Sequence, residues 1–169
     1  MKIITIYRGN ITKLGFDAIV NSANPSLTSG GGVNGAIHTA AGSELAKQCR
    51  ALHGCAIGKA KITDAFNLPA LKIIHTVGPI WQGGIANEKM LLTSCYLNCL
   101  DTAIDNGLTS IAFPAISTGN YGYPKEQAAQ IAYTAVTSFI ETHNQIKKIC
   151  FVAFDTETEK IYREIFATF

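Results

Sequence analysis

Long apolar runs are absent from this sequence of 169 residues. No stretch approaches the roughly 18 consecutive apolar residues that a membrane-spanning helix requires. The opening segment, MKIITIYRGN, carries polar side chains where a secretory signal peptide has an unbroken apolar segment. We therefore expect a protein without a membrane span, and we expect it in the cytoplasm.

Charge is also sparse. Charged residues make up 15% of the chain, and 14 Lys and Arg against 12 Asp and Glu give a formal net charge of +2. No basic run is longer than Lys147-Lys148. Because nucleic-acid binding needs a basic patch, this balance argues against a nucleic-acid partner. The hydrophobic share of 47% excludes a disordered chain and indicates a globular domain with a sizeable core.

The sequence has no Cys-x-x-Cys pair and no cysteine–histidine spacing typical of zinc sites. Its cysteines are odd in number: Cys49, Cys55, Cys95, Cys99 and Cys150. Cys95 and Cys99 lie four residues apart on an apolar helical stripe, which favours packing as small hydrophobic side chains. We expect buried free thiols rather than disulfides, and neither a metal site nor a cofactor.

Short β-branched and apolar segments, typical of buried strands, alternate with segments of helical periodicity. The predicted strands are Lys2–Tyr7, Asp17–Asn21, Lys61–Thr63, Lys72–Val77, Ser110–Ile116 and Lys148–Phe154. The predicted helices are Asn34–Ala41, a segment from an N-cap at Ser43 to about His53, Asn87–Asn106, Pro124 to about Glu141, and Glu157 to Phe169. This alternation predicts an α/β fold with helices on both faces of the sheet. The lack of repeats, linkers and low-complexity segments favours a single domain over residues 1–169.

A glycine-rich loop separates the second predicted strand from the first predicted helix. Gly30, Gly32 and Gly35 satisfy the G-x-G-x-x-G pattern of dinucleotide-binding folds. That pattern belongs directly after a strand and needs an acid about 20 residues later. Here eight residues lie between Asn21 and Gly30, no acid lies between residues 44 and 64, and the Gly-Lys-Ser/Thr of a P-loop is missing. Both nucleotide-fold interpretations are therefore rejected.

The physical chemistry of the loop does not depend on that pattern. Glycines let the backbone approach a ligand closely, and a helix beginning at Val33 or Asn34 presents unpaired N–H groups to a phosphate. A second loop, ISTGNYG at residues 116–122, also joins a buried strand to a helix, and its Tyr121 could stack on a sugar. Ligands of open α/β sheets bind at the carboxyl ends of strands, so the two loops predict a diphosphate site. The alternatives are structural loops without a ligand and an ordinary half-buried tyrosine.

The stretches NSANPSL, GGGVNGAIHTAAG, IIHTVGP and IAFPAISTGNYG follow one another in this order. With these motifs the sequence resembles the macro domain family over nearly its whole length, most closely the bacterial MacroD-type members. The resemblance implies a three-layer α/β/α fold with a mixed central sheet and a site for ADP-ribose. It also implies deacylation of O-acyl-ADP-ribose and removal of mono-ADP-ribose from acidic side chains, with ADP-ribosylated proteins as partners.

The resemblance assigns binding residues by position. The adenine would contact Asn10, Ile11 and Phe154. The phosphates would be held by Gly31, Gly32, Val33, Ser117, Thr118, Gly119, Asn120 and Tyr121. The distal ribose would be surrounded by the amides of Asn21 and Asn24, which donate and accept hydrogen bonds without repelling a diphosphate.

Two asparagines, Asn10 and Asn34, stand where relatives usually carry Asp, and Asn120 stands where most relatives have an aliphatic residue. The side-chain oxygen of Asn10 is expected to accept a hydrogen bond from the adenine amino group. Asn34 replaces an acid that positions or activates water, and an amide cannot take a proton near neutral pH. Asn34 shares a helix face with His38, and with Asn21 these are the expected catalytic residues. The remaining histidines are expected to be structural: His53, His75 and His143.

The sequence leaves three functions open. The first is a metal-independent hydrolase of ADP-ribose esters, in which the phosphate of the ligand itself activates the water. The second, favoured by the two asparagines, is a non-catalytic ADP-ribose reader. The third is a regulator that binds a ribonuclease or RNA, which the small net charge supports least.

Overall fold

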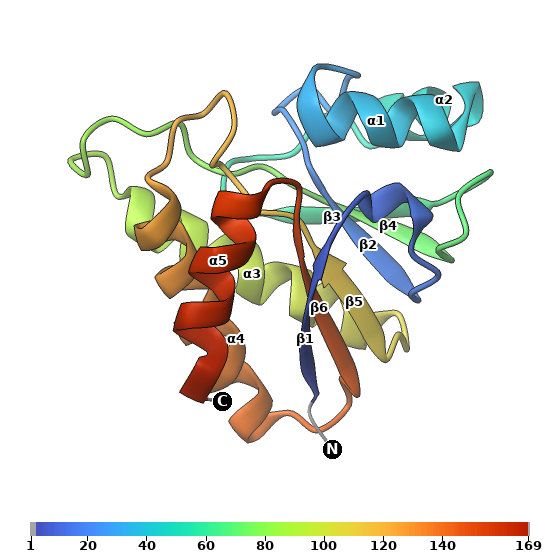
Figure 1. Ribbon diagram of the computed structural model, residues 1–169. Coiled ribbons are helices and arrows are strands. Elements are labelled where there is room, and N and C mark those ends of the chain that lie inside the picture. The colour runs from blue at the N-terminus through green and yellow to red at the C-terminus, as the bar shows by residue number, and fades with distance from the viewer. Residues whose placement is uncertain (1–2, 169) are drawn as a thin grey trace.

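One sheet forms the centre of residues 3–168, the part of the chain that the computed structural model describes (Figure 1). Its strands are β1 (Ile4–Arg8), β2 (Ala18–Ser22), β3 (Ala60–Asp64), β4 (Lys72–Thr76), β5 (Ser110–Phe113) and β6 (Lys148–Ala153). The sheet has six strands in the order β1-β6-β5-β2-β4-β3. The pairings are parallel except for that of β3 with β4 at one edge, which is antiparallel. The mixed sheet implied by the resemblance is therefore confirmed.

Helices cover both faces of this sheet. They are α1 (Gly32–Ala41), α2 (Ser43–Arg50), α3 (Glu88–Asp105), α4 (Lys125–Thr142) and α5 (Thr156–Ile165). Figure 1 shows α3, α4 and α5 together on one face, with α1 and α2 on the other. Because side chains alternate across a strand, Ala18 and Val20 of β2 join the core under α3–α5, while Ile19 joins the core under α1 and α2. The three-layer α/β/α architecture is confirmed.

The predicted N-cap of the second helix is wrong. Gly42, not Ser43, occupies the cap, and Ser43 is the first helical residue. Gly42 has φ of 94°, a backbone angle that favours glycine, and it also ends α1. Pro124 likewise caps α4 instead of opening it as the first helical residue. At both helix starts, the backbone conformation of the glycine or proline determines where the helix begins, and the capping preference of the neighbouring residue does not.

Other boundaries differ from the prediction as well, among them the ends of β5 and α5. β5 ends at Phe113 because Pro114 has no N–H to donate to the ladder. The last helix ends at Ile165, which is half-buried, and a short 3₁₀ turn, Phe166–Thr168, follows. Lys2 of the first predicted strand and Phe169 of the last predicted helix lie outside the described residues.

All five cysteines are free and buried, as predicted. Burial raises the pKa of the Cys95 thiol to about 11, and it raises the thiol pKa of the other cysteines as well. Within residues 3–168, no group of three His, Cys, Asp or Glu side chains is placed to hold one metal ion. No helix in the same range is long and apolar enough to cross a bilayer.

The amino ends of β2 and β5 are joined by Asp17. Its Oδ2 accepts hydrogen bonds from the N–H of Thr109 at 2.8 Å and from the N–H of Ser110 at 3.3 Å. The backbone N–H of Asp17 donates to Ser110 Oγ at 2.8 Å. The Thr109 N–H, ahead of the other donors, holds the pKa of the Asp17 carboxyl below its ordinary value. The carboxylate therefore stabilises the fold above that ordinary pKa, and its contribution is lost as the pH falls through the lowered value.

Asp17→Ala is expected to lower the free energy of unfolding by about 1 kcal/mol at pH 7, because backbone N–H groups lose their acceptor. Urea denaturation followed by circular dichroism measures the change. The matched control is Asp101→Ala, which removes an exposed carboxylate from α3. Equal midpoints for Asp17→Ala and the parent would show that water replaces the carboxylate without cost.

Candidate functional site

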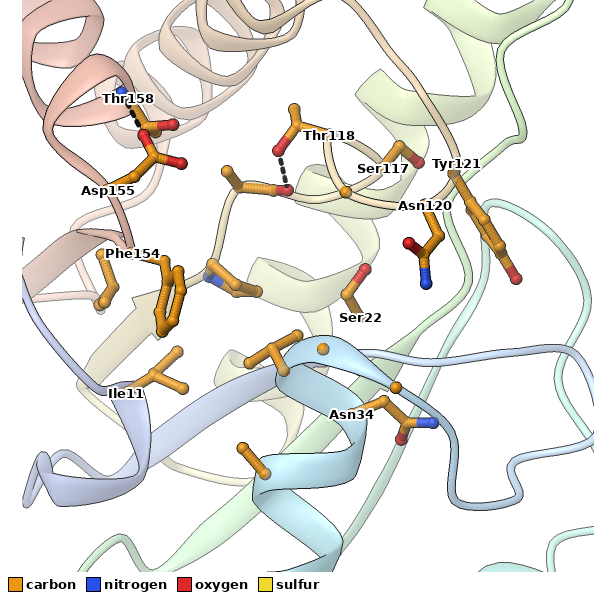
Figure 2. A pocket seen from close by; sticks show the side chains of 18 of the residues that line it. Ile11, Ser22, Asn34, Ser117, Thr118, Asn120, Tyr121, Phe154, Asp155 and Thr158 are labelled. Atoms are coloured by element: carbon orange, nitrogen blue, oxygen red, sulfur yellow. Dashed lines mark hydrogen bonds between the residues drawn. The ribbon is translucent and has the colours of Figure 1, made fainter.

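A cavity lies where four parallel strands end. It measures about 650 Å³, and the residues that line it include some that directly follow β1, β2, β5 and β6 (Figure 2). A cavity at the carboxyl edge of a parallel sheet is the usual place for a ligand in an α/β fold. Most residues assigned from the sequence line it: Asn10, Ile11, Asn24, Gly31, Gly32, Val33, Asn34, Ser117, Thr118, Gly119, Asn120, Tyr121 and Phe154.

The first glycine loop ends in the amino terminus of α1. Gly31 caps the helix without a side-chain hydrogen bond, and the first turn contains no acidic residue. The N–H groups of Gly32, Val33 and Asn34 precede the first intrahelical donor, since the N–H of Gly35 is the one that reaches Gly31 O, at 3.2 Å. Among residues 3–168 these N–H groups have no acceptor, and the positive end of the helix dipole lies with them at the cavity.

Gly35 is required by the close approach of the loop to the helix. A Cβ at position 35 would collide with the backbone carbonyl of Gly30. Gly30 itself lies close to the helix, since a Cβ there would be 3.2 Å from Asn34 Nδ2. The packing of the loop onto α1 thus fixes the direction of its N–H groups.

The second loop, between β5 and α4, is held by its own hydrogen bonds. Thr118 donates to Ala115 O through both its N–H, at 3.3 Å, and its hydroxyl, at 2.8 Å. The N–H of Gly122 donates to Gly119 O at 3.0 Å. Within the described part of the chain, the N–H groups of Gly119, Asn120 and Tyr121 find no backbone or side-chain acceptor. Figure 2 shows Asn120 and Tyr121 on the side of the cavity opposite Phe154.

The loop between β4 and α3 supports the second loop from outside, and no sequence pattern pointed to this contact. Glu88 is buried, and its carboxylate accepts hydrogen bonds from the N–H groups of Gln82 and Gly84, at 2.9 and 2.7 Å. In the same loop the N–H of Trp81 donates to Tyr121 O at 2.8 Å. The sequence does contain one relevant feature, since Glu88 lies in the first turn of a predicted helix, where an acid is well placed to accept hydrogen bonds from N–H groups.

An aromatic ring stands open at the other end of the cavity. The Phe154 side chain is 90% exposed although it directly follows a buried strand, and Ile11 lies opposite it with 3% exposure. Beside them, Asn10 caps a short 3₁₀ turn, Ile11–Lys13. Its Oδ1 accepts from the N–H of Thr12 at 3.0 Å and from the Thr12 hydroxyl at 2.7 Å.

This geometry corrects the expectation for Asn10. A carboxamide oxygen has two acceptor positions, and Thr12 fills both. The group that Asn10 can offer a ligand is therefore its NH₂, a donor, and not the oxygen that was expected to accept from an amino group.

Among the described residues that line the cavity, one carboxylate is present, that of Asp155, and it is engaged. Its Oδ1 accepts from the N–H of Thr158 at 2.7 Å as the N-cap of α5, and Oδ2 accepts from Lys125 Nζ at 3.2 Å. The Thr158 N–H, with Lys125 in addition, holds the pKa of the Asp155 carboxyl below its usual range. Neither Asp155 nor Lys125 was assigned to the site from the sequence, although an Asp between a strand and a helix is a common cap.

Two of the three expected catalytic residues lie outside this cavity wall. Asn21 is fully buried beneath it, with its Nδ2 2.9 Å from Asn34 Oδ1 and 3.1 Å from His75 Nδ1. His38 lines a separate, shallow hollow beside Ser29, and burial lowers its pKa. Asn34 alone of the three reaches the cavity. Residue spacing on a helix placed His38 near Asn34, but it could not show that His38 is buried and that its Nε2 has no hydrogen-bond partner among the described residues.

Comparison with known proteins gives consistent matches. Residues 20–132 match the family model of the Macro domain. A macro domain-containing protein of Mesorhizobium japonicum is 54% identical over 159 residues, which cover 94% of this chain and 90% of that protein. An O-acetyl-ADP-ribose deacetylase of Citrobacter rodentium is 51% identical over 166 residues, covering 96% of this chain and 94% of the relative.

Solved structures agree with these matches. The Oceanobacillus iheyensis macrodomain with ADP superimposes with a TM-score of 0.90 at 42% identity, covering 96% of this chain and 89% of that one. The Trypanosoma brucei macrodomain in complex with ADP-ribose gives a TM-score of 0.92 at 40% identity, covering 96% of this chain and 68% of that one.

Proposed function

The chain belongs to the macro domain family, and on that basis we propose that it binds ADP-ribose in the cavity and hydrolyses ADP-ribose esters. Its substrates are O-acyl-ADP-ribose and proteins that carry mono-ADP-ribose on acidic side chains. The proposal is carried by two sets of backbone N–H groups, at Gly32–Asn34 and at Gly119–Tyr121, which belong to residues lining one cavity and find no acceptor in the described part of the chain.

The diphosphate is the part of the ligand that this arrangement fits best. Main-chain N–H groups donate to phosphate oxygens, and the dipole of α1 adds a favourable field. Hydrogen bonds to a charged acceptor contribute about 1.5–3 kcal/mol each. The carboxylate of Asp155 at the wall is neutralised by Lys125, so little negative charge opposes the ligand.

The adenine occupies the end of the cavity at Phe154. An exposed aromatic ring gains by stacking on a base, at about 1–3 kcal/mol per base. Asn10 then donates from its NH₂ to a ring nitrogen of the base, because its oxygen is held by Thr12. The distal ribose lies near Asn24 and Asn34, at the far end of the first glycine loop.

Hydrolysis in this site needs no protein carboxylate as a base. A water oxygen adds to the acyl carbon, and a phosphate oxygen of the ligand takes the proton of that water. The tetrahedral intermediate then expels the ribose oxygen, which recovers the proton, so that ADP-ribose and the free carboxylic acid leave. Remote binding of the adenine and phosphates orients the reacting ester.

A non-catalytic ADP-ribose reader is the second candidate, and one observation favours it. The amide at Asn34 stands at the cavity wall where a carboxylate was expected, and the carboxylate of Asp155 is engaged by Thr158 and Lys125. A reader would bind the ligand as described and release it unchanged.

Incubation of the protein with O-acetyl-ADP-ribose separates the two candidates. Acetate release above the uncatalysed rate is the expected result. Tight binding by calorimetry without acetate release would assign the reader function instead, and absence of binding to ADP-ribose would contradict both.

Phe154→Ala is expected to weaken ADP-ribose binding by about 10-fold, because the base loses its stacking surface. Isothermal titration calorimetry measures the change. The matched control is Phe66→Ala, which removes another exposed aromatic ring that does not line the cavity. Equal weakening by both substitutions would argue against adenine at this end.

A further inference from the structure

A continuous chain of hydrogen bonds, buried except at its partly buried first bond, runs from the cavity wall to the edge of the sheet. We call it the polar chain; its members are Thr28, Asn34, Asn21, His75 and Thr63. Asn34 Nδ2 lies 2.9 Å from Thr28 O, and Asn34 Oδ1 lies 2.9 Å from Asn21 Nδ2. Asn21 Nδ2 is also 3.1 Å from His75 Nδ1, and His75 Nε2 is 2.8 Å from Thr63 Oγ1.

The donor and acceptor of each hydrogen bond in the polar chain are fixed by the group at its first end, Thr28 O. Thr28 O is a carbonyl and can only accept, so Asn34 must place its NH₂ there and turn its oxygen toward Asn21. Asn21 then donates both hydrogens of its amide, one to Asn34 Oδ1 and one to His75 Nδ1. His75 is therefore an acceptor at Nδ1 and carries its proton on Nε2, where it donates to the Thr63 hydroxyl.

Burial makes this arrangement rigid. Asn21 and His75 are fully buried. If the Asn21 amide turned over, its oxygen would face Asn34 Oδ1 and His75 Nδ1, and acceptor would meet acceptor at both contacts. Burial, with a smaller contribution from a charge on His38, lowers the pKa of His75 to about 3, so the ring is neutral at physiological pH. Asn21 Oδ1 has no partner within the described residues, which is a further sign that the orientation of this amide is imposed by its neighbours.

Asn34 is the member of the polar chain that lines the cavity, so the hydrogen-bond directions of the chain determine which of its side-chain atoms a ligand meets. One hydrogen of its NH₂ is bound to Thr28 O, and the nitrogen lies beside Gly30 in the first glycine loop. Figure 2 shows the nitrogen of Asn34 turned toward that loop and its oxygen turned away from it. The second hydrogen is thus the side-chain donor that position 34 has left for a ligand, in addition to its backbone N–H.

We propose that His75 is a positioning residue for ester hydrolysis, which fixes Asn34, through Asn21, as a hydrogen-bond donor to the acyl oxygen. The inference rests on the proposed function. When water adds to the acyl carbon, the electron pair of the C=O bond moves to its oxygen, and the Asn34 N–H stabilises that developing charge. His75 itself touches neither substrate nor water.

The experiment is a double-mutant cycle on acetate release from O-acetyl-ADP-ribose. Thr63→Val removes the hydroxyl acceptor of the His75 N–H and leaves that group only the weak acceptor Cys49 Sγ, at 3.9 Å. Because residues of one hydrogen-bond network are energetically coupled, this change is expected to lower kcat by about 10-fold in the parent. The Kd for ADP-ribose is expected to stay unchanged. In an Asn34→Ala background, Thr63→Val is expected to change kcat no further, because the group it orients is gone.

Thr76→Val is the matched control. Thr76 is also buried, and its hydroxyl makes a 2.8 Å hydrogen bond to Lys59 O, outside the polar chain. This control is expected to leave kcat unchanged. Equal loss of kcat from Thr63→Val in the presence and absence of Asn34 would overturn the inference, since it would show a general loss of structure.

Nuclear magnetic resonance gives a readout that does not depend on turnover. The ring nitrogens of His75 are expected to show a proton on Nε2 at pH 7, and the side-chain amide signals of Asn21 and Asn34 are expected to shift in Thr63→Val but not in Thr76→Val. A proton on Nδ1 would overturn the inference. A parent that binds ADP-ribose but releases no acetate would instead overturn the proposed function, and with it any role of His75 in hydrolysis.

Discussion

Gly35→Ala is expected to weaken ADP-ribose binding by about 100-fold, a loss of the size that two misaligned hydrogen bonds to phosphate would cause. The added methyl group would collide with the backbone carbonyl of Gly30, and a carbonyl cannot rotate away as a flexible side chain can. The glycine loop must therefore move away from α1. Its N–H groups would then point past the diphosphate instead of toward it.

Calorimetric titration with ADP-ribose measures this loss, and urea denaturation shows whether the variant remains folded. Gly15→Ala is the matched control, because a Cβ there would meet no atom within 4 Å and the position lies outside the cavity. Parent-like affinity in a folded Gly35→Ala protein would contradict the assignment of the loop to the phosphates.

Acidification from pH 7 to pH 5 is expected to remove about 2 kcal/mol of folding stability through His75. An unfolded histidine takes up a proton near its ordinary pKa of 6.5, whereas burial lowers the pKa of His75 to about 3 in the folded protein. The unfolded state therefore binds more protons between these values. Stability is full above pH 6.5 and falls as the pH drops toward 3. The lowered pKa of His38 adds a loss of the same sign.

Urea midpoints at pH 7 and pH 5 measure the difference. His75→Gln is expected to remove most of it, because the glutamine oxygen can accept from Asn21 but cannot be protonated in this range. The control is His53→Asn, at an exposed position with φ of 57°, a conformation that Asn tolerates. An unchanged pH dependence in His75→Gln would show that the buried ring does not titrate as its surroundings dictate.

The fold was predictable because its signals are local. Alternation of Ala18, Ile19 and Val20 between two cores, and the stripe of Leu92, Cys95 and Cys99 on α3, follow directly from strand and helix periods. The errors lie at junctions, where Gly42 and Pro114 set the ends through backbone angle and a missing N–H. Such effects depend on the three-dimensional path of the neighbouring segment, and a short stretch of sequence does not reveal that path.

The site was predictable to the extent that it is made of backbone. Loops rich in glycine after buried strands pointed to main-chain donors, and both loops line the cavity. Side-chain directions were not predictable. The oxygen of Asn10 is occupied by Thr12 two residues away, and His75 is linked to a residue 54 positions earlier in the chain. The contact between Asn21 and His75 forms only when β2 and β4 pair in the sheet.

Asn34, which stands where relatives usually carry Asp, makes a hydrogen bond that a carboxylate could not make. Asn34 places its nitrogen 2.9 Å from Thr28 O, a carbonyl that also accepts from Asn24. A carboxylate in the same orientation would set oxygen against oxygen, so an acid at this position needs a different loop conformation or a proton. The amide is therefore matched to the loop that this protein has.

The burial of all five cysteine thiols has a practical consequence for labelling the protein. Reagents that attach to cysteine have little access to the five thiols of the folded protein, which are at most 7% exposed. Burial also raises the pKa values of these thiols, which favours the less reactive protonated form. One cysteine introduced at Asn120, on the rim of the cavity, would therefore take a fluorescent dye alone. The same molecule could then report ligand entry by its emission, in real time and without a separated product.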